Sequence, residues 1–276
     1  MPDTLVAARQ ALVQHRQRHG SWPRIWRPRG FTEKVAFRKA FDRRALLTQL
    51  TDKYQARKYV EERLGPDVLP RLYFATKNPS EIPFDDLPDR FVVKPTHGSG
   101  WVEIVRRKAD LDRAALIATC ERWLGQSFYE ETGEWAYRNV VPRILVEELI
   151  DDGTGAAPLD YKLFVFDGEV ACIQVDADRF VDHRCDLYLR PWQRLDVKYG
   201  FENIEGGVPE PKHLDEMIGA AETLGRGIDF VRVDLYDTDE KFFFGEFTIT
   251  PGNGMDRFEP LEYDEYFGKL WKLRTR

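Results

Sequence analysis

The sequence predicts an α+β fold in which most strands pair antiparallel and helices cover one face of the sheets. Three observations favour this class. Residues 161–175 form two apolar runs joined by Asp167-Gly168, a dipeptide typical of a type I′ hairpin turn. Two more apolar runs, residues 230–236 and 242–248, flank a short polar turn. Segments with helical periodicity lie between the strands.

The composition is that of a folded protein. The chain has 276 residues, of which 42% are hydrophobic and 13% aromatic, and its net charge is −6. This content excludes an intrinsically disordered chain, and the length suits one large domain or two small lobes. No stretch approaches the ~20 consecutive apolar residues of a membrane-spanning helix. The near balance of 41 basic and 47 acidic residues argues against nucleic acid as a partner.

The cysteines and the first residues predict a cytoplasmic location. The chain starts without the basic-then-apolar order of a secretory signal. Its three cysteines are odd in number and follow no metal-ligand spacing, as expected for a reduced compartment.

The N-terminal region, residues 1–50, is rich in arginine and mostly helical in its pattern. Residues 4–19 and 32–50 are predicted helices, separated by an irregular stretch that contains Gly20 and Pro23. Thr51-Asp52 then offers an N-cap for a helix that ends at Leu64.

Strands and helices alternate in the rest of the chain. A helix with apolar positions from Leu116 to Leu124 ends before Gly125, and a second, from Leu214 to Ala221, ends at Gly225. The remaining expected strands are residues 69–75, 91–94, 101–105 and 144–146.

A lysine on an apolar strand precedes a glycine-rich turn. The strand at 91–94 ends in Lys94, and the turn that follows contains Gly98, Ser99 and Gly100. Glycines let backbone N–H groups approach an anion closely, and the lysine adds the point charge that a polyphosphate needs. The loop joins two strands, unlike a P-loop, which opens a helix. An ordinary hairpin with an exposed lysine explains this motif equally well.

Two expected strands that each carry an acidic residue can bring carboxylates together. Arg232 and Asp234 share one face of a strand, and Glu246 and Thr248 share one face of the next, because side chains alternate along strands. If these strands pair, their oxygen atoms suit Mg²⁺, and Arg232 is placed to stabilise negative charge. The alternative is a solvated polar face with an Arg–Asp salt bridge, but the neighbouring phenylalanines place the charges at the edge of a core.

A third motif is an apolar strand that runs into Glu147 and Glu148. Such a strand can present backbone groups and a carboxylate to an adenine edge. Strands that end in acidic residues are common, so by itself this motif favours a purely structural interpretation.

Taken together, the motifs resemble those of the ATP-grasp superfamily. Their sequences are most similar to its TupA-like family, named for teichuronopeptide biosynthesis. The resemblance covers roughly residues 30–265. Its most specific segments are Thr51–Tyr54, Phe91–Trp101, Leu145–Ile150, Asp160–Lys162, Gln174–Phe180, Val231–Tyr236 and Gly245–Gly254. The resemblance implies an ATP-grasp domain over residues 51–276, in which a first lobe (about 51–143) and a second lobe (about 144–276) clasp ATP.

The resemblance also implies roles for single residues. Lys94 and Arg232 are the expected catalytic residues, where Lys94 holds the ATP phosphates and Arg232 stabilises the transferred phosphate. The expected nucleotide-binding residues are Lys53, Lys94, Gly98, Ser99, Gly100, Glu147, Glu148, Ile150 and Asp160. Asp234 and Glu246 are expected to hold Mg²⁺, together with Thr248, which stands where the superfamily usually has asparagine.

A polar cluster after the hairpin supplies candidates for binding the acceptor substrate. These are Asp176, Asp178, Arg179, His183 and Arg184, together with Lys162 from the hairpin itself. A solvated loop is an equal alternative for each of them.

The function implied is that of an ATP-dependent carboxylate–amine ligase that forms an acyl phosphate. The expected substrates are a uronic acid or glycan-linked carboxylate and an amine such as an amino acid, in cell-surface polysaccharide or peptidyl-glycan biosynthesis. Association with glycan-assembly enzymes or with a second copy is also expected. The alternatives are a sugar phosphotransferase and an inactive nucleotide-binding module.

Overall fold

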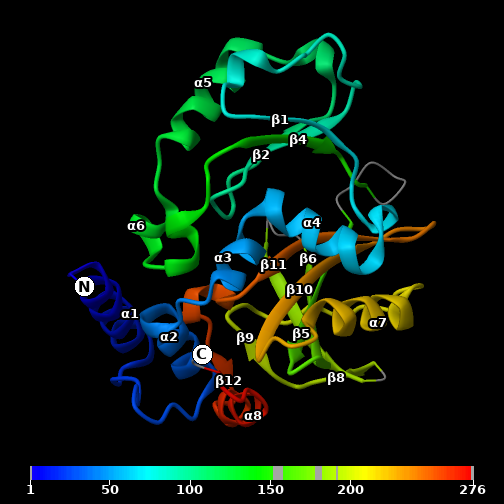
Figure 1. Ribbon diagram of the computed structural model, residues 1–276. Coiled ribbons are helices and arrows are strands. Elements are labelled where there is room, and N and C mark those ends of the chain that lie inside the picture. Colours follow the sequence, from blue (N-terminus) through cyan, green and yellow to red (C-terminus); the bar gives the residue numbers. More distant parts are fainter. Residues whose placement is uncertain (1, 152–157, 178–181, 191, 275–276) are drawn as a thin grey trace.

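The computed structural model describes residues 2–151, 158–177, 182–190 and 192–274. In these ranges the strands form a four-stranded sheet, a six-stranded sheet and a two-stranded pair. Figure 1 shows the smaller sheet above the larger one, with helices α3 and α4 between them. None of the helices in the described ranges is long and apolar enough to cross a membrane.

The smaller sheet is wholly antiparallel and has the order β1-β4-β2-β3. Its strands are β1 (Leu72–Thr76), β2 (Phe91–Pro95), β3 (Glu103–Val105) and β4 (Ile144–Glu148). Helix α5 (Arg113–Leu124) packs against it through Leu116, Cys120 and Trp123. The last of these strands pairs with both β1 and β2, so residues 144–148, which the sequence division assigned to the second lobe, belong to the sheet of the first.

The larger sheet is also antiparallel, with the order β11-β10-β5-β6-β7-β8. The hairpin expected around Asp167-Gly168 is present as β5 and β6. The strands around the polar turn pair as β10 and β11. The bounds are β5 (Asp160–Phe166), β6 (Glu169–Ala177), β7 (Arg184–Leu189), β8 (Gln193–Arg194), β10 (Phe230–Asp237) and β11 (Phe242–Thr248).

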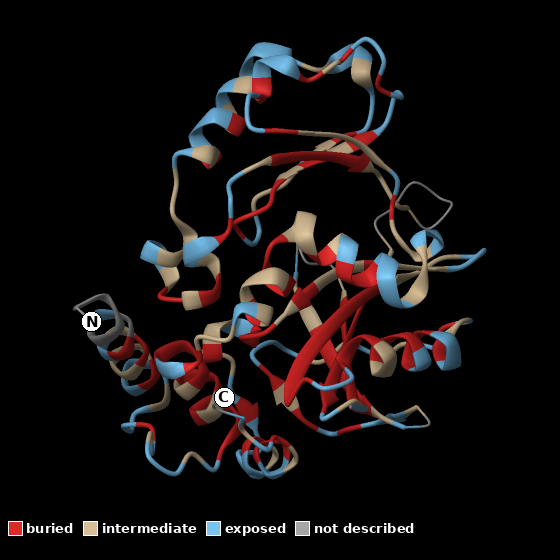
Figure 2. Cartoon of the chain, viewed as in Figure 1, coloured by how far each residue is buried: buried red, intermediate tan, exposed pale blue. Residues whose placement is uncertain are grey.

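The two faces of the larger sheet carry different side chains because strand residues alternate. One face is largely apolar and includes Leu163, Val175 and Val233, which pack against α4 (Lys53–Leu64) and α7 (Leu214–Gly225). The other face is apolar at one end, around Phe164 and Cys172, and charged at the other. Figure 2 shows that the central strands are almost wholly buried.

A β-bulge at Gly245 sets the orientation of β11. Asp234 lies opposite Glu246, whereas the next residue, Leu235, lies opposite Phe244, so Gly245 is the extra residue. A Cβ on Gly245 would lie 3.1 Å from the carbonyl oxygen of Asp234, which is tighter than ordinary packing. The bulge lets Phe244 pack in the apolar core while Glu246, two residues later, reaches the charged face.

The N-terminal region packs against the larger sheet. Its helices are α1 (Pro2–His19), α2 (Phe31–Phe41) and α3 (Ala45–Thr51). The predicted single helix over 32–50 is wrong: the chain is extended at Asp42, whose carboxylate accepts the Arg44 backbone N–H at 3.2 Å. Phe31 packs in the same core as Trp271, near the C-terminus.

The other described elements are short or lie near the C-terminus. They are η1 (Pro66–Val68), η2 (Pro79–Glu81), η3 (Lys108–Asp110), α6 (Phe128–Thr132), η4 (Trp135–Asn139), β9 (Lys198–Tyr199), η5 (Pro251–Gly254), β12 (Phe258–Glu259) and α8 (Glu262–Leu270). The predicted strand at 101–105 is shorter than expected and begins at Glu103. The predicted N-cap is confirmed, since Asp52 accepts the backbone N–H groups of Tyr54 and Gln55.

A buried carboxylate joins the N-terminal region to the C-terminal segment. Asp229, directly before β10, accepts hydrogen bonds from Arg38 and Arg44, each at 2.8 Å, and from the Trp271 indole at 2.9 Å. Arg38 is only 2% exposed. The arginines hold the pKa of Asp229 below its ordinary value against the opposing effect of burial.

Substitution Asp229→Ala should lower the free energy of unfolding by about 3–5 kcal/mol, because it leaves the Arg38 charge buried without its main partner. Urea unfolding followed by circular dichroism measures this. The control is Asp215→Ala on the exposed side of α7, which should change the free energy by less than about 0.5 kcal/mol. Equal effects of the two substitutions would contradict the role given to Asp229.

Candidate active site between the two sheets

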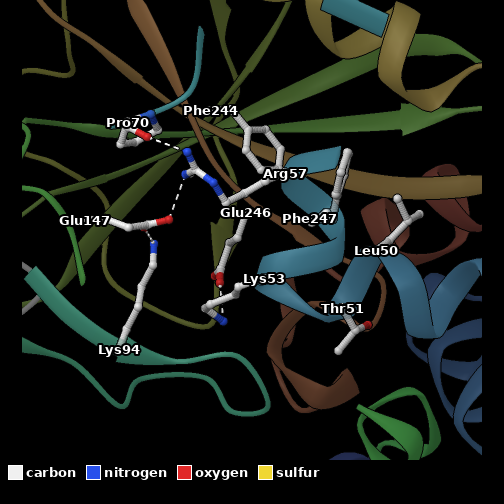
Figure 3. A pocket seen from close by; sticks show the side chains of 12 residues that line it. Leu50, Thr51, Lys53, Arg57, Pro70, Lys94, Glu147, Phe244, Glu246 and Phe247 are labelled. Carbon is white, nitrogen blue, oxygen red and sulfur yellow. Dashed lines mark hydrogen bonds and ion pairs between the residues drawn. The ribbon is translucent and has the colours of Figure 1, made fainter. Parts of the chain in front are cut away.

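A pocket lies where the smaller sheet faces α4 and β11 (Figure 3). Lys94 from β2 and Glu147 from β4 enter it from one side, and Glu246 from β11 enters it from the other. Helix α4 supplies Lys53 and Arg57. The site therefore draws on both lobes and on the helix between them.

Strand register brings Lys94 and Glu147 together. Lys94 pairs with Leu145 and Val92 pairs with Glu147, so Lys94 and Glu147 are diagonal neighbours on one face of the smaller sheet. Their side chains form an ion pair of 2.6 Å between Nζ and Oε2. Lys94 is thus a partly buried, paired cation and not the exposed lysine of an ordinary hairpin.

Arg57 is a site residue that the sequence motifs did not reveal. Its Nη1 donates to Oε1 of Glu147 at 2.7 Å, and its Nη2 donates to the Pro70 carbonyl oxygen at 2.7 Å. It lies four residues after Lys53, one turn further along α4, so both cations face the pocket. That spacing is the signal in the sequence that could have identified Arg57.

Lys53 connects the glycine-rich loop to the larger sheet. Its Nζ donates to the carbonyl oxygen of Gly98 at 2.8 Å and lies 3.1 Å from Oε2 of Glu246. This cation lowers the pKa of Glu246 to about 2, although burial raises it. In the loop, Gly98 lies under the Trp101 ring, where a Cβ would be only 2.4 Å from a ring carbon. Ser99 and Gly100 are exposed.

The charged end of the larger sheet holds the predicted metal and phosphate residues. Arg232 donates to both carboxylate oxygens of Asp234, at 2.8 and 2.6 Å, and to the Thr248 hydroxyl at 3.0 Å. Asp234 lies directly opposite Glu246 across β10 and β11. Arg232 is 8% exposed and Asp234 is 3% exposed, so the alternative of a solvated salt bridge is wrong.

The oxygen atoms of Asp234, Glu246 and Thr248 fit Mg²⁺. This ion binds through one or two carboxylates and keeps its other positions for water and phosphate oxygens. Burial raises the pKa of Asp234 even though Arg232 and Lys162 act in the opposite direction, so a further cation would stabilise its charged form. Within the described ranges, no group of three or more His, Cys, Asp or Glu side chains is arranged to hold a metal ion.

Lys162 lies inside the sheet and pairs with three carboxylates. It forms an ion pair with Asp160 and lies 3.3 Å from Asp176 and 3.9 Å from Asp234. All four residues are at most 4% exposed. Asp160, predicted to bind ribose, therefore lies in this cluster, opposite Asp176 of the neighbouring strand.

The remaining predicted residues are more dispersed. His183 Nε2 lies 3.3 Å from an oxygen of Asp176. Arg184 instead pairs with Asp182 at 2.8 Å and lies outside the cluster around Lys162. Glu148 accepts the backbone N–H of Arg71 at 3.0 Å. Ile150 is partly exposed after the end of β4. Asp178 and Arg179 lie outside the described residues.

Comparison with known families gives one extended match. The family model described as TupA-like ATPgrasp matches residues 33–272. No curated protein matches the chain at a significant level.

Solved structures with a similar fold are distant in sequence. D-alanine–D-alanine ligase from Bacillus anthracis, complexed with ATP, is 19% identical with a TM-score of 0.44, over 75% of this chain and 56% of that one. VanG D-Ala:D-Ser ligase from Enterococcus faecalis is 16% identical with a TM-score of 0.48, over 82% and 61%. ATP-grasp ligase PsnB, complexed with a minimal precursor, is 11% identical with a TM-score of 0.45, over 79% and 60%. The chain thus spans less than two thirds of the length of these structures.

Substitution Lys53→Met should raise the pKa of Glu246 from about 2 into or above the ordinary carboxyl range near ~4.3, because only burial and weaker cations then act on it. The stability that this pair supplies is present at neutral pH and is lost as the pH falls through the lowered pKa. Titration of the glutamate ¹³C carboxyl resonances by NMR measures the shift.

The matched control is Lys58→Met, which removes an exposed lysine from the same helix. It should leave the Glu246 titration unchanged. An unchanged Glu246 pKa in the Lys53 variant would show that the lysine does not set it.

Proposed function

The chain belongs to the TupA-like ATP-grasp family, and we propose that it is an ATP-dependent ligase that joins a carboxylate to an amine. The observation that carries this proposal is the opposed arrangement of charges between the sheets. Cations from the first lobe and α4 line one pocket with Glu246 of the second lobe. Glu246 lies opposite Asp234, which is the partner of Arg232. Phosphoryl transfer needs positive charge and a metal site around the phosphates on both sides.

In this proposal three cations hold the nucleotide phosphates. Lys94 and Arg57 now share the two oxygens of Glu147, and Lys53 is paired with Glu246. Bound phosphate oxygens would replace these carboxylates as partners, and backbone groups of the loop at Gly98–Gly100 would cover them. In the same proposal Glu147 accepts from the adenine amino group, backbone groups of Glu148 and Ile150 contact the base, and Asp160 is the ribose ligand.

The reaction proposed has two steps. A carboxylate oxygen of the acceptor attacks the γ-phosphorus of ATP, the bond to the β,γ-bridging oxygen breaks, and ADP leaves. The amine nitrogen then attacks the acyl phosphate carbon, loses a proton, and expels phosphate to give an amide. Arg232 supplies fixed positive charge to the transferred phosphate in both steps. Mg²⁺, held by Asp234, Glu246 and Thr248, would neutralise charge on the phosphate oxygens.

The charged cluster beyond Arg232 is the proposed acceptor side. Lys162 and His183 stand on this side of the larger sheet, whereas Arg184, which is also part of the proposal, pairs with Ala177 and lies on the other face. Asp178 and Arg179 lie in the adjoining segment outside the described residues. We propose a carboxylate-bearing sugar or glycan as acceptor and an amino acid as amine, in cell-surface polysaccharide or peptidyl-glycan biosynthesis. Cytoplasmic location and association with glycan-assembly enzymes or a second copy are part of the same proposal.

The proposed ligation predicts acceptor-dependent ADP release and a trapped hydroxamate. Purified protein is incubated with Mg·ATP, hydroxylamine and a panel of uronic acids and amino acids, and both products are measured. Substitution Asp234→Asn should lower turnover at least about 100-fold, whereas Asp215→Asn should leave it unchanged. A phosphorylated sugar formed without any amine would indicate a phosphotransferase. ATP binding without turnover for any acceptor would indicate a binding module.

Arg57→Met should weaken ATP binding about tenfold, since a charge-assisted hydrogen bond contributes roughly 1.5 kcal/mol or more. Isothermal titration calorimetry with Mg·ATP measures this. The control is Arg63→Met, which removes an arginine from the same helix that stacks on Tyr59 and does not line the pocket. Equal affinities for the two variants would remove Arg57 from the nucleotide site.

A further inference from the structure

A second cavity, of about 340 Å³, lies where α1, the start of α2 and the start of α8 meet. It shares no lining residue with the pocket between the two sheets. Figure 1 shows these three helices in the lower part of the molecule, apart from the smaller sheet. The volume lies in the range of small-molecule sites. The two ends of the chain thus build a cavity that the proposed ligation does not use.

Two histidines one helical turn apart, His15 and His19 of α1, line this cavity. Nδ1 of His15 lies 3.2 Å from the carbonyl oxygen of Ser21, and Nε2 of His19 lies 2.8 Å from that of Gly254. A carbonyl oxygen can only accept, so each of these nitrogens carries the proton of its ring. In the neutral rings, Nε2 of His15 and Nδ1 of His19 are therefore hydrogen-bond acceptors.

The acceptor nitrogen of His15 has no partner among the described residues. His15 is only 3% exposed, and its Nε2 is buried without a hydrogen bond. Burial, together with the neighbouring His19, lowers the pKa of His15 to about 4, so the ring is neutral at neutral pH. A desolvated polar atom without a partner is costly. A ligand in the cavity that donates a hydrogen bond to this nitrogen would remove the cost.

Two buried carboxylates that line the cavity differ in how they are neutralised. Glu33 accepts from Nε of Arg24 at 2.8 and 3.1 Å, so its charge is matched. Asp264 accepts the backbone N–H of Thr32 at 2.8 Å, and no cation in the described ranges forms an ion pair with it. Burial raises the pKa of Asp264 although Thr32 donates to it. A cation in the cavity would therefore stabilise the charged form of Asp264.

The exposed rim of the cavity adds more negative than positive charge. Glu259 and Glu265 are two further carboxylates, and Arg257 is the one cation in the lining besides the paired Arg24. The cavity thus offers chiefly hydrogen-bond acceptors and negative charge. An ammonium group supplies what is missing, since it carries three N–H donors and a positive charge.

We propose that this cavity binds a small ligand with an ammonium group, and that Nε2 of His15 and the Asp264 carboxylate accept from its N–H donors. Amino acids and amino sugars both carry this group, and the cavity is large enough for either. The inference goes beyond the proposed function, because the cavity is separate from the nucleotide pocket and its occupation needs no ATP.

The test measures binding to the full chain, without nucleotide, by isothermal titration calorimetry. The probes are two pairs, D-glucosamine with D-glucose and L-serine with L-glycerate, in which a hydroxyl replaces the ammonium group. The amine of at least one pair should bind at least about tenfold more tightly than its hydroxyl counterpart. The pair that shows this difference identifies the source as an amino sugar or an amino acid. No binding of either amine, or equal binding within both pairs, would overturn the proposal.

Two substitutions of His15 separate a ligand contact from a structural role. His15→Asn keeps a donor for the Ser21 carbonyl oxygen and removes the acceptor at Nε2, whereas His15→Gln places an amide oxygen near that position. The first should weaken amine binding about tenfold, and the second should keep the Kd within about threefold of the wild type. The control is Gln17→Ala on the exposed side of α1, which should leave the Kd unchanged. Equal Kd values for the two His15 variants would contradict the contact.

Asp264→Asn tests the charge. The amide keeps an oxygen for the Thr32 backbone N–H and removes the negative charge, so amine binding should weaken at least about tenfold while the melting temperature stays close to that of the wild type. An unchanged Kd would overturn the role of Asp264. Mg·ATP affinity, measured in the same variants, should not change. Loss of amine binding with intact ATP binding thus separates this site from the nucleotide pocket.

Discussion

Charges buried on one face of the larger sheet constrain much of this structure. Lys162 lies between Asp160, Asp176 and Asp234, and all four residues are at most 4% exposed. A single uncompensated charge at such a position costs several kcal/mol. The cluster is satisfied only in the observed register of β5, β6 and β10, because a shift by one residue would bring apolar side chains into it. Charge pairing and core packing thus specify the same register.

The same face explains why the first fifty residues form no separate domain. Its apolar end is covered by Phe31 of α2, Phe267 of α8 and Trp271, which directly follows α8. Asp229 then binds arginines of the N-terminal region and the indole of the C-terminal segment at one point. Because these residues cover the apolar end of the face, the charged end is the part that faces the first lobe.

The sequence predicts features that follow from local pattern, and it misses those that depend on distant contacts. The hairpin at Asp167-Gly168, the Asp52 cap and the pairing of Asp234 with Glu246 follow from turn chemistry and alternation. The predicted lobe boundary divides a sheet, because β4 pairs with strands that lie between residues 72 and 95. Arg57 belongs to no motif, and its contact with Glu147 arises only when α4 packs near β4. The roles of the matched motif residues stay predictions.

The pairing of cations and carboxylates in the pocket connects the nucleotide and the metal in the proposed reaction. Lys53 now neutralises Glu246, and its charge keeps the pKa of that carboxyl low. When a phosphate takes Lys53 as its partner, Glu246 and Asp234 are left facing each other across β10 and β11 with less positive charge nearby. Two like charges so placed repel strongly, and a divalent cation between them removes the repulsion and binds the phosphate as well. In the proposed reaction each ligand thus creates the electrostatic need for the other, so the site would favour the metal–nucleotide complex over either component alone.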